Sequence, residues 1–459
     1  MEMARHRRRN RQSIPQRQLG RHARRASRYH VRMANGIHDV LVIGGGLVGA
    51  SLACALEASG LDVALVESEP QRASVIPDSD ARSLALAASS LNALGALGVL
   101  RHMPTQPTPI RRIHVSRRGD FGAVSLRAEE YGRAAFGGVV PAPALGVALQ
   151  ARLRELRGFS HYAGARLVAL READDLREAD IVRDGATTTL RARLLVGADG
   201  TASFVRDALG IGASSHDYAQ HLFAGSVRAA RPSDGQAWER FTDDGPMALL
   251  PQTSGQYASG MYGCICTVPS GQAEYVAALD DAGFIALLQE RFGWRAGRFI
   301  AVGRRVGYPL RQLVAERLTA SRAVVMGNAA QTLHPIGAQG FNLGLRDALT
   351  LAELVSDVCA YGGDVGDASL LDAYVRRRAG DREETLHFSD GLARITSNPT
   401  PPLRLLRSFA MSALDALPDL RASLVGSTMG FRGVVPALAR DAFKEVNSKF
   451  SVRGEPVEP

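Results

Sequence analysis

Residues 327–347, GNAAQTLHPIGAQGFNLGLRD, form the segment of this chain best suited to chemistry. They include four glycines, a proline and a histidine, followed by a run with helical spacing. A chain does not need so many small and polar residues to turn a corner, so we interpret the segment as backbone that lies against a ligand. His334 is its best titratable candidate, as a base or a polarising group. A structural histidine bonded to its own loop is the alternative, and the sequence leaves both open.

A second glycine-rich turn lies nearer the start of the chain, in DVLVIGGGLVGASLACALEASGLDVALVES. Residues 39–43 are a short apolar run of the kind that forms a strand buried on both faces. Residues 47–59 have helical spacing, Gly60 ends that helix, and residues 61–67 form a second strand. The segment predicts a complete βαβ unit with the glycine turn between its first strand and its helix.

The turn has the form GxGxxG, with Gly44, Gly46 and Gly49. Gly44 permits a tight turn, Gly46 lets a pyrophosphate approach the helix N-terminus, and Gly49 allows close packing of helix and strand. Glu67 ends the second strand about 20 residues on, where a carboxylate can accept both ribose hydroxyls of an adenosine and repels a 2′-phosphate. The pattern predicts an ADP-containing dinucleotide that is not NADP. The motif alone leaves NAD and FAD open.

Later segments repeat this pattern on both sides of a strand-rich region. GADGTASFVRDAL reads as a strand end, a corner at Asp199 and Gly200, and a short helix, and RAVVMGN reads as another buried strand. Residues 80–100 are expected to be a loop and a helix, residues 110–128 a hairpin, and residues 216–308 several strands interrupted by one helix. We therefore expect an α/β fold in which an antiparallel sheet domain is inserted into a discontinuous Rossmann-like domain.

The predicted domains have the following boundaries. The dinucleotide-binding domain comprises residues 34–112, 139–212 and 309–385. The inserted substrate domain comprises residues 113–138 and 213–308, residues 386–445 are C-terminal helices, and residues 1–33 and 446–459 are disordered tails.

The net charge of +9 comes from the N-terminal tail. Residues 1–33 contain eleven arginines and one acid, so the rest of the chain is close to neutral and we expect no nucleic-acid partner for it. The tail could contact nucleic acid or a membrane surface, serve as a transit peptide, or have no role. Met33 would make a natural start, and we expect no role for the residues before it.

The four cysteines are Cys54, Cys264, Cys266 and Cys359, and they form no CxxC pair. Cys264 and Cys266 alternate in a strand-like run, which is poor spacing for a metal, so we expect reduced thiols and no metal site. The sequence has no apolar run of the roughly 18 residues that a membrane span needs, and no recognisable secretory signal. We expect a cytoplasmic protein.

The C-terminal region PPLRLLRSFAMSALDALPDLRASLVG has leucines at helical spacing, with Arg404, Arg407 and Arg421 among them. This face could contact the inner face of a membrane or a partner protein of a biosynthetic complex. It could equally pack against the main body. Peripheral association with a membrane is therefore one of three possible roles that the sequence leaves open for this region.

Six segments together resemble one enzyme family. They are DARSLALAASS, IHVSRRGDFG, ERFTDDGPMALLP, RVGYPL, GADGTASFVR and residues 327–347. With the GxGxxG turn, they make the chain similar to the single-component FAD-dependent aromatic hydroxylases over residues 39–440. Within that family it most resembles the ubiquinone-biosynthesis branch, which includes the 2-polyprenyl-6-methoxyphenol hydroxylases. The resemblance favours FAD as the resident dinucleotide and implies a fold like that of p-hydroxybenzoate hydroxylase.

The resemblance also implies roles for single residues. Arg82 would contact the FAD phosphates or the flavin edge, and Asp199 and Gly200 would lie beside the pyrophosphate. Asn328 stands where most relatives have the aspartate that binds the ribitol. An amide can still bind hydroxyls there, without a charge.

The flavin ring would lie along a thin backbone wall at Pro335 and Gly337. Because the order of Ala and Gly in IGAQG is swapped relative to the branch, we expect Gly337 rather than residue 338 to have a positive φ. N–H groups at the start of the next helix would face the pyrimidine edge of the flavin, where reduced flavin is anionic. These N–H groups belong to Gly340, Phe341 and Asn342.

The implied reaction is hydroxylation of a polyprenylated phenol. NADH or NADPH would dock transiently and reduce the flavin, which would react with O2 to give a C4a-hydroperoxide that transfers OH to the ring. Candidate residues for the phenol pocket, each of which could be ordinary core, are Phe241, Leu249, Leu250, Pro251 and Tyr308. The alternatives are hydroxylation of another ring position or of a soluble aromatic, and an FAD-bound subunit that scaffolds a quinone-biosynthesis assembly.

Overall fold

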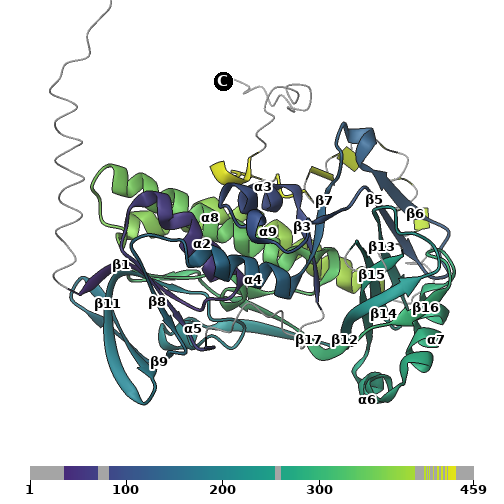
Figure 1. The fold of residues 1–459 in the computed structure, drawn as a ribbon, viewed down its shortest axis with the longest axis horizontal. Coiled ribbons are helices and arrows are strands. Elements are labelled where there is room, and N and C mark those ends of the chain that lie inside the picture. The colour runs from purple at the N-terminus through teal and green to yellow at the C-terminus, as the bar shows by residue number, and fades with distance from the viewer. Residues whose placement is uncertain are drawn as a thin grey trace, which may run out of the picture. The chain divides into compact units, whose positions relative to one another are not determined.

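The computed structural model describes residues 36–70, 82–253 and 260–397, with part of residues 408–440. The predicted tails at residues 1–33 and 446–459 lie outside the described residues, as does much of the leucine-rich C-terminal region. The predicted domain boundaries stay predictions. The strands of these residues form one sheet of eight strands, one of nine and one of three, and Figure 1 labels many of them.

The predicted βαβ unit is confirmed. Strand β1 (Ile37–Ile43) leads into helix α2 (Leu47–Leu56), and the chain returns as β2 (Val63–Glu67), which pairs parallel with β1. The β1 residues Val40, Leu41 and Val42 are fully buried, as expected for a strand covered on both faces. The sheet has the order β18-β19-β11-β1-β2-β8, extended from β11 by β10 and β9. The added strands are β8 (Phe159–Ala163), β9 (Arg166–Ala173), β10 (Leu176–Arg183), β11 (Ala186–Gly197), β18 (Thr319–Ala320) and β19 (Ala323–Val325).

A nine-stranded sheet contains most of the strand-rich region, in the order β20-β17-β12-β15-β14-β13-β5-β6, with β16 paired to β12. The hairpin predicted in residues 110–128 is confirmed as the antiparallel pair β5–β6. The strands are β5 (Arg112–Arg117), β6 (Ala123–Arg127), β12 (Ala213–Ala229), β13 (Gln236–Thr242), β14 (Gly245–Gln252), β15 (Met261–Pro269), β16 (Phe299–Val302), β17 (Val306–Ala315) and β20 (Gln331–Thr332).

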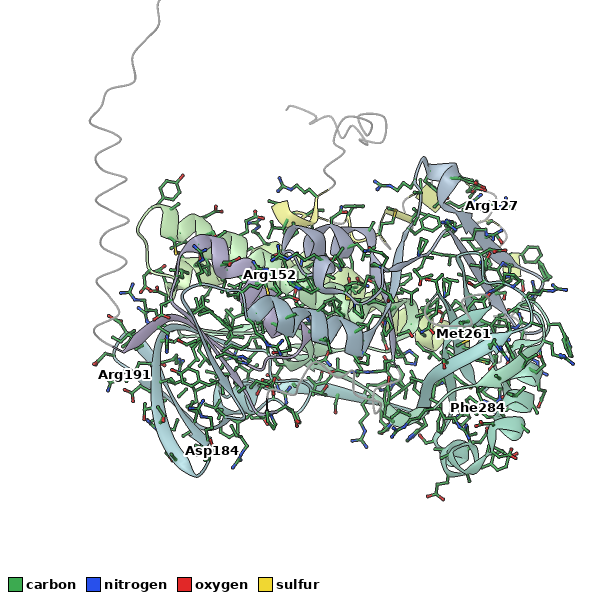
Figure 2. All side chains as sticks on the ribbon, in the orientation of Figure 1. Arg127, Arg152, Asp184, Arg191, Met261 and Phe284 are labelled. Carbon is green, nitrogen blue, oxygen red and sulfur yellow. The ribbon has the colours of Figure 1, made fainter. Side chains whose placement is uncertain are left out.

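The two faces of this sheet pack against different partners. On one face, here called the α7 face, helices α6 (Ala273–Ala278) and α7 (Asp281–Phe292) cover the sheet, and Phe284 of α7 packs into a cluster with Phe223 of β12 (Figure 2). On the other, here called the inner face, Ala224 of β12 belongs to a separate cluster. Side chains alternate between faces along a strand, so these two clusters indicate the face to which a residue points where the pairing is regular.

Residues 83–87 correct one expectation, because they form a strand where the sequence predicted a loop. Strand β3 (Ser83–Ala87) pairs antiparallel with β7 (Gly137–Pro141), which also pairs with β4 (Thr108–Pro109). Helix α3 (Ala88–Ala96) follows β3, and α4 (Ala142–Leu153) follows β7. The strand forms because a segment some fifty residues away in the chain pairs with its backbone groups, which a local pattern cannot reveal.

Helices α8 (Gln339–Ala360) and α9 (Ala368–Ser397) are joined by buried charges. Arg346 donates two hydrogen bonds to Asp381, at 2.7 and 3.0 Å. Arg378 donates to Asp347 at 2.6 Å and lies 2.7 Å from Asp381. All four side chains are buried, so each charge depends on its partners. The network fixes α8, and hence the loop before it, against α9.

Removing one charge from this network is expected to destabilise the fold. Asp381→Ala leaves Arg346 without its carboxylate partner and should lower the free energy of unfolding by about 3–5 kcal/mol, measured by chemical denaturation. Glu383→Ala is the matched control, because Glu383 forms an exposed pair with His387 on the same helix. The control should change stability by less than about 1 kcal/mol. Equal losses in the two variants would contradict a structural role for the network.

Candidate active site

The geometry of the first turn shows what the absence of a side chain does at each of its three glycines. Gly44 has a φ of 103°, and a Cβ there would lie 2.4 Å from the Ala198 carbonyl oxygen. A Cβ on Gly49 would lie 2.0 Å from the Gly44 carbonyl oxygen. A Cβ on Gly46, just before α2, would have nothing within 4 Å. Gly44 and Gly49 are therefore needed for packing, whereas Gly46 leaves open space beside a helix N-terminus.

The carboxylate of Glu67 turns toward this glycine turn. One oxygen accepts the Gly45 N–H at 2.7 Å, and the other accepts the Glu69 N–H at 2.9 Å. Ser68 Oγ also donates to this second oxygen, at 3.2 Å. Since each carboxylate oxygen has about two lone-pair sites, the oxygen that accepts from Gly45 can accept a further hydrogen bond. The placement fits the predicted contact with ribose hydroxyls, which stays a prediction.

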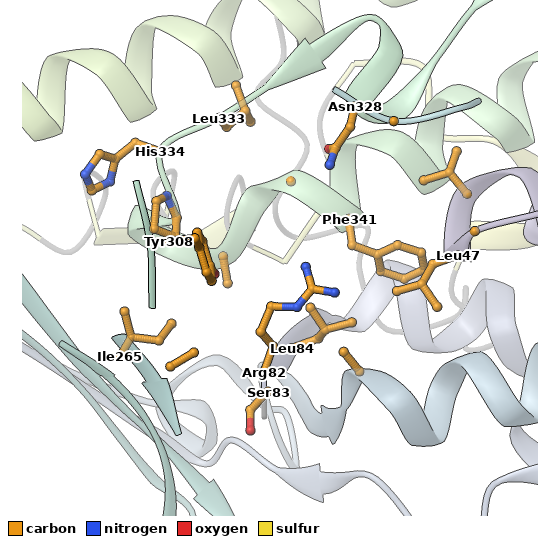
Figure 3. A pocket seen from close by; sticks show the side chains of 18 of the residues that line it. Leu47, Arg82, Ser83, Leu84, Ile265, Tyr308, Asn328, Leu333, His334 and Phe341 are labelled. Carbon is orange, nitrogen blue, oxygen red and sulfur yellow. The ribbon is translucent and has the colours of Figure 1, made fainter. Parts of the chain in front are cut away.

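A cavity of about 350 Å³ lies between this turn, the inner face of the nine-stranded sheet and the loop before α8 (Figure 3). Nine of the residues singled out from the sequence line it: Gly46, Arg82, Gly200, Tyr308, Asn328, His334, Pro335, Gly340 and Phe341. Its wall also contains apolar residues that the sequence analysis missed, among them Leu47, Leu84, Ala224, Ile265 and Leu333. The fold thus brings together segments that are up to about 300 residues apart in the chain.

The two sides of the cavity differ in chemistry. Figure 3 shows Leu47 and Phe341 on one side, Ile265 and Tyr308 on the other, and Arg82 extending between them. The first side, here called the dinucleotide side, has open backbone at the glycine turn, and Arg82 lies at its boundary; both suit phosphates. The second, here called the substrate side, is mostly apolar and suits an aromatic ring.

Asp199 and Asn342 do not line this cavity. The Asp199 carboxylate accepts hydrogen bonds from Ser203 Oγ at 2.5 Å and the Val205 N–H at 3.0 Å, at the start of α5 (Phe204–Ala208). The Asn342 side chain accepts the Ala87 N–H at 2.9 Å and donates to other backbone oxygens. Asp199 therefore holds its own corner, and the Asn342 side chain joins β3 to α8. No sequence motif marked this second connection.

The loop before α8 has two residues with positive φ. Gly337 has a φ of 69°, as expected, but Ala338 also has a φ of 52°. The expectation that only Gly337 would need this freedom is therefore wrong. Gly337 faces Phe388 of α9, whereas Ala338 lines the cavity. A left-handed alanine costs roughly 1–2 kcal/mol, so the loop is strained where it meets the site.

The five candidates for the phenol pocket occupy three different places. Tyr308 lines the cavity. Leu249 lies in the cluster on the α7 face, and Pro251 is directly opposite Tyr262 of that same cluster. Phe241 and Leu250 lie on the inner face but pack into clusters beyond the cavity lining. The residues of this sheet that do line the substrate side, apart from Tyr308, are Ala224 and Ile265.

His334 is buried in the wall of the substrate side. Its Nδ1 accepts the Ile336 N–H at 3.4 Å, so its Nε2 carries the hydrogen and donates to Gln220 Oε1 at 3.2 Å. Burial lowers the pKa of His334 to about 4, against a smaller raising effect from Asp390. The imidazole is therefore neutral at pH 7. The hydrogen bond from Ile336 agrees with the interpretation of His334 as a structural histidine bonded to its own loop. Because His334 also lies in the cavity wall, a role in catalysis stays open.

Gln220 reaches His334 because of an irregularity in β12. The pairing of β12 with β17 shifts between Asp217 and Gln220, and Ala219 between them has a φ of 53°. The Asp217 carboxylate accepts the Ala219 N–H at 2.8 Å and stabilises this bulge. Sequence analysis missed Gln220, since no motif marks a bulge within a long strand.

Lowering the pH is expected to destabilise the protein through His334. Below its ordinary pKa of 6.5 the unfolded chain binds a proton that the folded chain does not bind until about pH 4. This residue should therefore remove about 3 kcal/mol of stability as the pH falls from 6.5 to 4. His334→Gln should flatten that part of the pH dependence in denaturant unfolding, whereas the exposed control His387→Gln should not. Parallel curves for wild type and His334→Gln would contradict the assignment.

Comparison with known proteins agrees with this geometry. Residues 38–389 match the family model described as FAD binding domain. The ubiquinone hydroxylase UbiL of Rhodospirillum rubrum is 33% identical, over 86% of this chain and 90% of its own length. The 3-demethoxyubiquinol 3-hydroxylase of Escherichia coli is 29% identical, over 87% of this chain and 100% of its own length.

The fold is shared with a solved structure. The p-nitrophenol 4-monooxygenase PnpA of Pseudomonas putida DLL-E4 superposes with a TM-score of 0.69 at 19% identity, over 86% of this chain and 98% of that one. The family match, which covers the predicted dinucleotide turn and the loop before α8, agrees with the choice of FAD over NAD. The chain belongs to the FAD binding domain family and is an FAD-dependent monooxygenase of the aromatic-hydroxylase type.

Proposed function

We propose that this protein hydroxylates the aromatic ring of a polyprenylated phenol in ubiquinone biosynthesis, with O2 and NADH or NADPH as co-substrates. The observation that carries the proposal is the cavity with two chemically different sides, one suited to a dinucleotide and one to an aromatic ring. The relatives named as ubiquinone hydroxylases support the substrate class.

The chain's own residues bind and orient the reactants. Bound FAD supplies the chemistry that activates O2 and delivers one oxygen atom to the ring. The backbone at Gly46 and the guanidinium of Arg82 would hold the phosphates, and Asn328 would bind ribitol hydroxyls. Pro335 would contribute backbone against which the flavin lies.

The substrate side would exclude water and hold the phenol. Ala224 and Ile265 give an apolar wall, which protects a reactive oxygen donor from water. His334 is neutral and held at both ring nitrogens, so it would act there as a fixed polar group. A proton lost from the phenol would need another acceptor, such as water reaching the substrate.

We also propose a peripheral membrane contact, because a polyprenyl substrate resides in a bilayer. None of the helices in the described part of the chain is long and apolar enough to cross a membrane. Phe121, beside the β5–β6 hairpin, and Phe409 are both more than 60% exposed and pack edge to face with ring centroids 5.4 Å apart. Exposed aromatic side chains of this kind suit a membrane interface.

The deciding experiment is turnover of defined phenols by the purified protein. With NADH or NADPH and O2, a prenylated phenol should be converted to its ring-hydroxylated product, with nicotinamide oxidation and oxygen uptake stimulated by that phenol. The product is identified by mass spectrometry and compared with that from the same phenol without its prenyl chain. Turnover only of the soluble phenol would contradict the substrate class, and the absence of any hydroxylated product would contradict the function.

Removing the negative charge of Glu67, at the end of β2, is expected to weaken FAD binding. Glu67→Gln keeps an acceptor for the Gly45 N–H but loses the charge that strengthens hydrogen bonds from ribose hydroxyls. We expect about tenfold weaker binding in titrations of apoprotein with FAD, followed by flavin fluorescence. Glu69→Gln, two residues on and exposed, is the control. Unchanged FAD affinity in Glu67→Gln would argue against the adenosine contact.

A further inference from the structure

Seven residues lie opposite one another in a single row across the nine-stranded sheet. The pairing register joins these residues from β17 to β6, each opposite the next on the neighbouring strand. Six of the seven are aliphatic, and the seventh is a glutamate. In order the row is Val306, Ala224, Ile265, Ala248, Glu239, Val115 and Val124.

Glu239 shares the inner face with the substrate side of the cavity. Residues directly opposite in paired strands point to the same face, and Ala224 and Ile265 of this row line the cavity. The alternation along β13 agrees, since Phe241 of the same strand contacts Ile336 of the cavity loop. Glu239 is two strands from Ile265, which is about 10 Å between backbones. Ala248, which is buried and has a small side chain, is the only residue of the row between them.

The Glu239 side chain has no hydrogen-bond or ion-pair partner within the described residues. Its strand neighbours Ala237 and Phe241 and its cross-strand neighbour Ala248 are buried, yet Glu239 keeps partial solvent access. The side chain of Glu239 therefore lies among apolar neighbours, while part of the residue reaches solvent. A polar group in such a place is unfavourable unless a ligand bonds to it.

We propose that Glu239 binds an oxygen substituent of the aromatic substrate. The inference rests on the proposed function. With the ring over Ala224 and Ile265, a hydroxyl or methoxyl oxygen on the far edge of the ring would point along the row toward Glu239.

The state of the carboxyl group suits this contact. Burial alone raises the pKa of Glu239 to about 8, so the group is mostly protonated at neutral pH. A protonated carboxyl donates one hydrogen bond and also accepts, which matches both a phenolic hydroxyl and a methoxyl oxygen. It needs no counter-charge on an apolar surface, unlike an arginine or lysine in the same place. Glu239 would therefore be a substrate-binding residue that sets which ring oxygens are accepted.

The test compares two variants with two ligands. Glu239→Leu removes the polar group at similar size, and Glu239→Gln keeps a donor and an acceptor. The ligands are a prenylated phenol with a ring methoxyl group and the same phenol without it, and binding is followed by the change in flavin absorbance of the holoenzyme. We expect Glu239→Leu to bind the methoxylated phenol about tenfold more weakly and the other phenol as wild type does. Glu239→Gln should stay within about threefold of wild type for both.

Stability measurements separate binding from folding. Because the Leu variant removes an unpartnered carboxyl group, its melting temperature should be equal to or above that of wild type, with full FAD content. Glu274→Leu, at an exposed position in α6, is the control and should change neither ligand's affinity. If Glu239→Leu binds both phenols as wild type does, the inference is overturned while the hydroxylase function stands. If wild type itself converts no phenol, the proposed function fails instead.

Discussion

Three backbone hydrogen bonds align the carboxyl ends of four strands, and the site depends on them. The N–H of Gly44 donates to Val66, that of Ala198 to Ile43, and that of Met326 to Gly197, at 2.7–2.9 Å. The turns after β1, β11 and β19 must therefore leave the sheet side by side. At Gly44 the backbone packs closely against Ala198, and the open space beside the turn lies at Gly46. This is the edge at which open α/β sheets bind ligands.

The loop before α8, which forms the opposite wall of the cavity, is connected to the buried charges of α8 and α9. Gln331, just before the cavity loop, donates to Asp347 at 2.8 Å and accepts from Arg382 at 2.9 Å. It thereby connects the loop to the same charged network that joins α8 to α9. Because both ends of the loop are fixed, the strained backbone at Ala338 can persist without a glycine. Rigidity in the helices thus offsets strain beside the ligand.

Local signals predicted the parts of the site that local geometry determines. The glycine turn, Glu67 and the loop at Pro335 needed only the spacing of residue types, and all lie at or beside the cavity. The choice between Leu249 and Ile265 as cavity lining could not be made in this way. A one-residue change of register exchanges the two faces of a strand, and the register is fixed by pairing with distant segments. The bulge that directs Gln220 to His334 depends on the same long-range pairing.

The distribution of charge across the cavity follows from the reaction that it serves. Arg82 lies between the two sides, and the open helix N-terminus at Gly46 adds positive potential where phosphates would bind. Burial keeps both His334, in the loop before α8, and Glu239, on the inner face of the sheet, neutral near pH 7, because it lowers the pKa of the histidine and raises that of the glutamate. A charge there would attract water to the place where oxygen is transferred. The fold therefore keeps uncharged polar groups near the substrate side, while positive potential lies at the glycine turn and, through Arg82, at the boundary between the two sides.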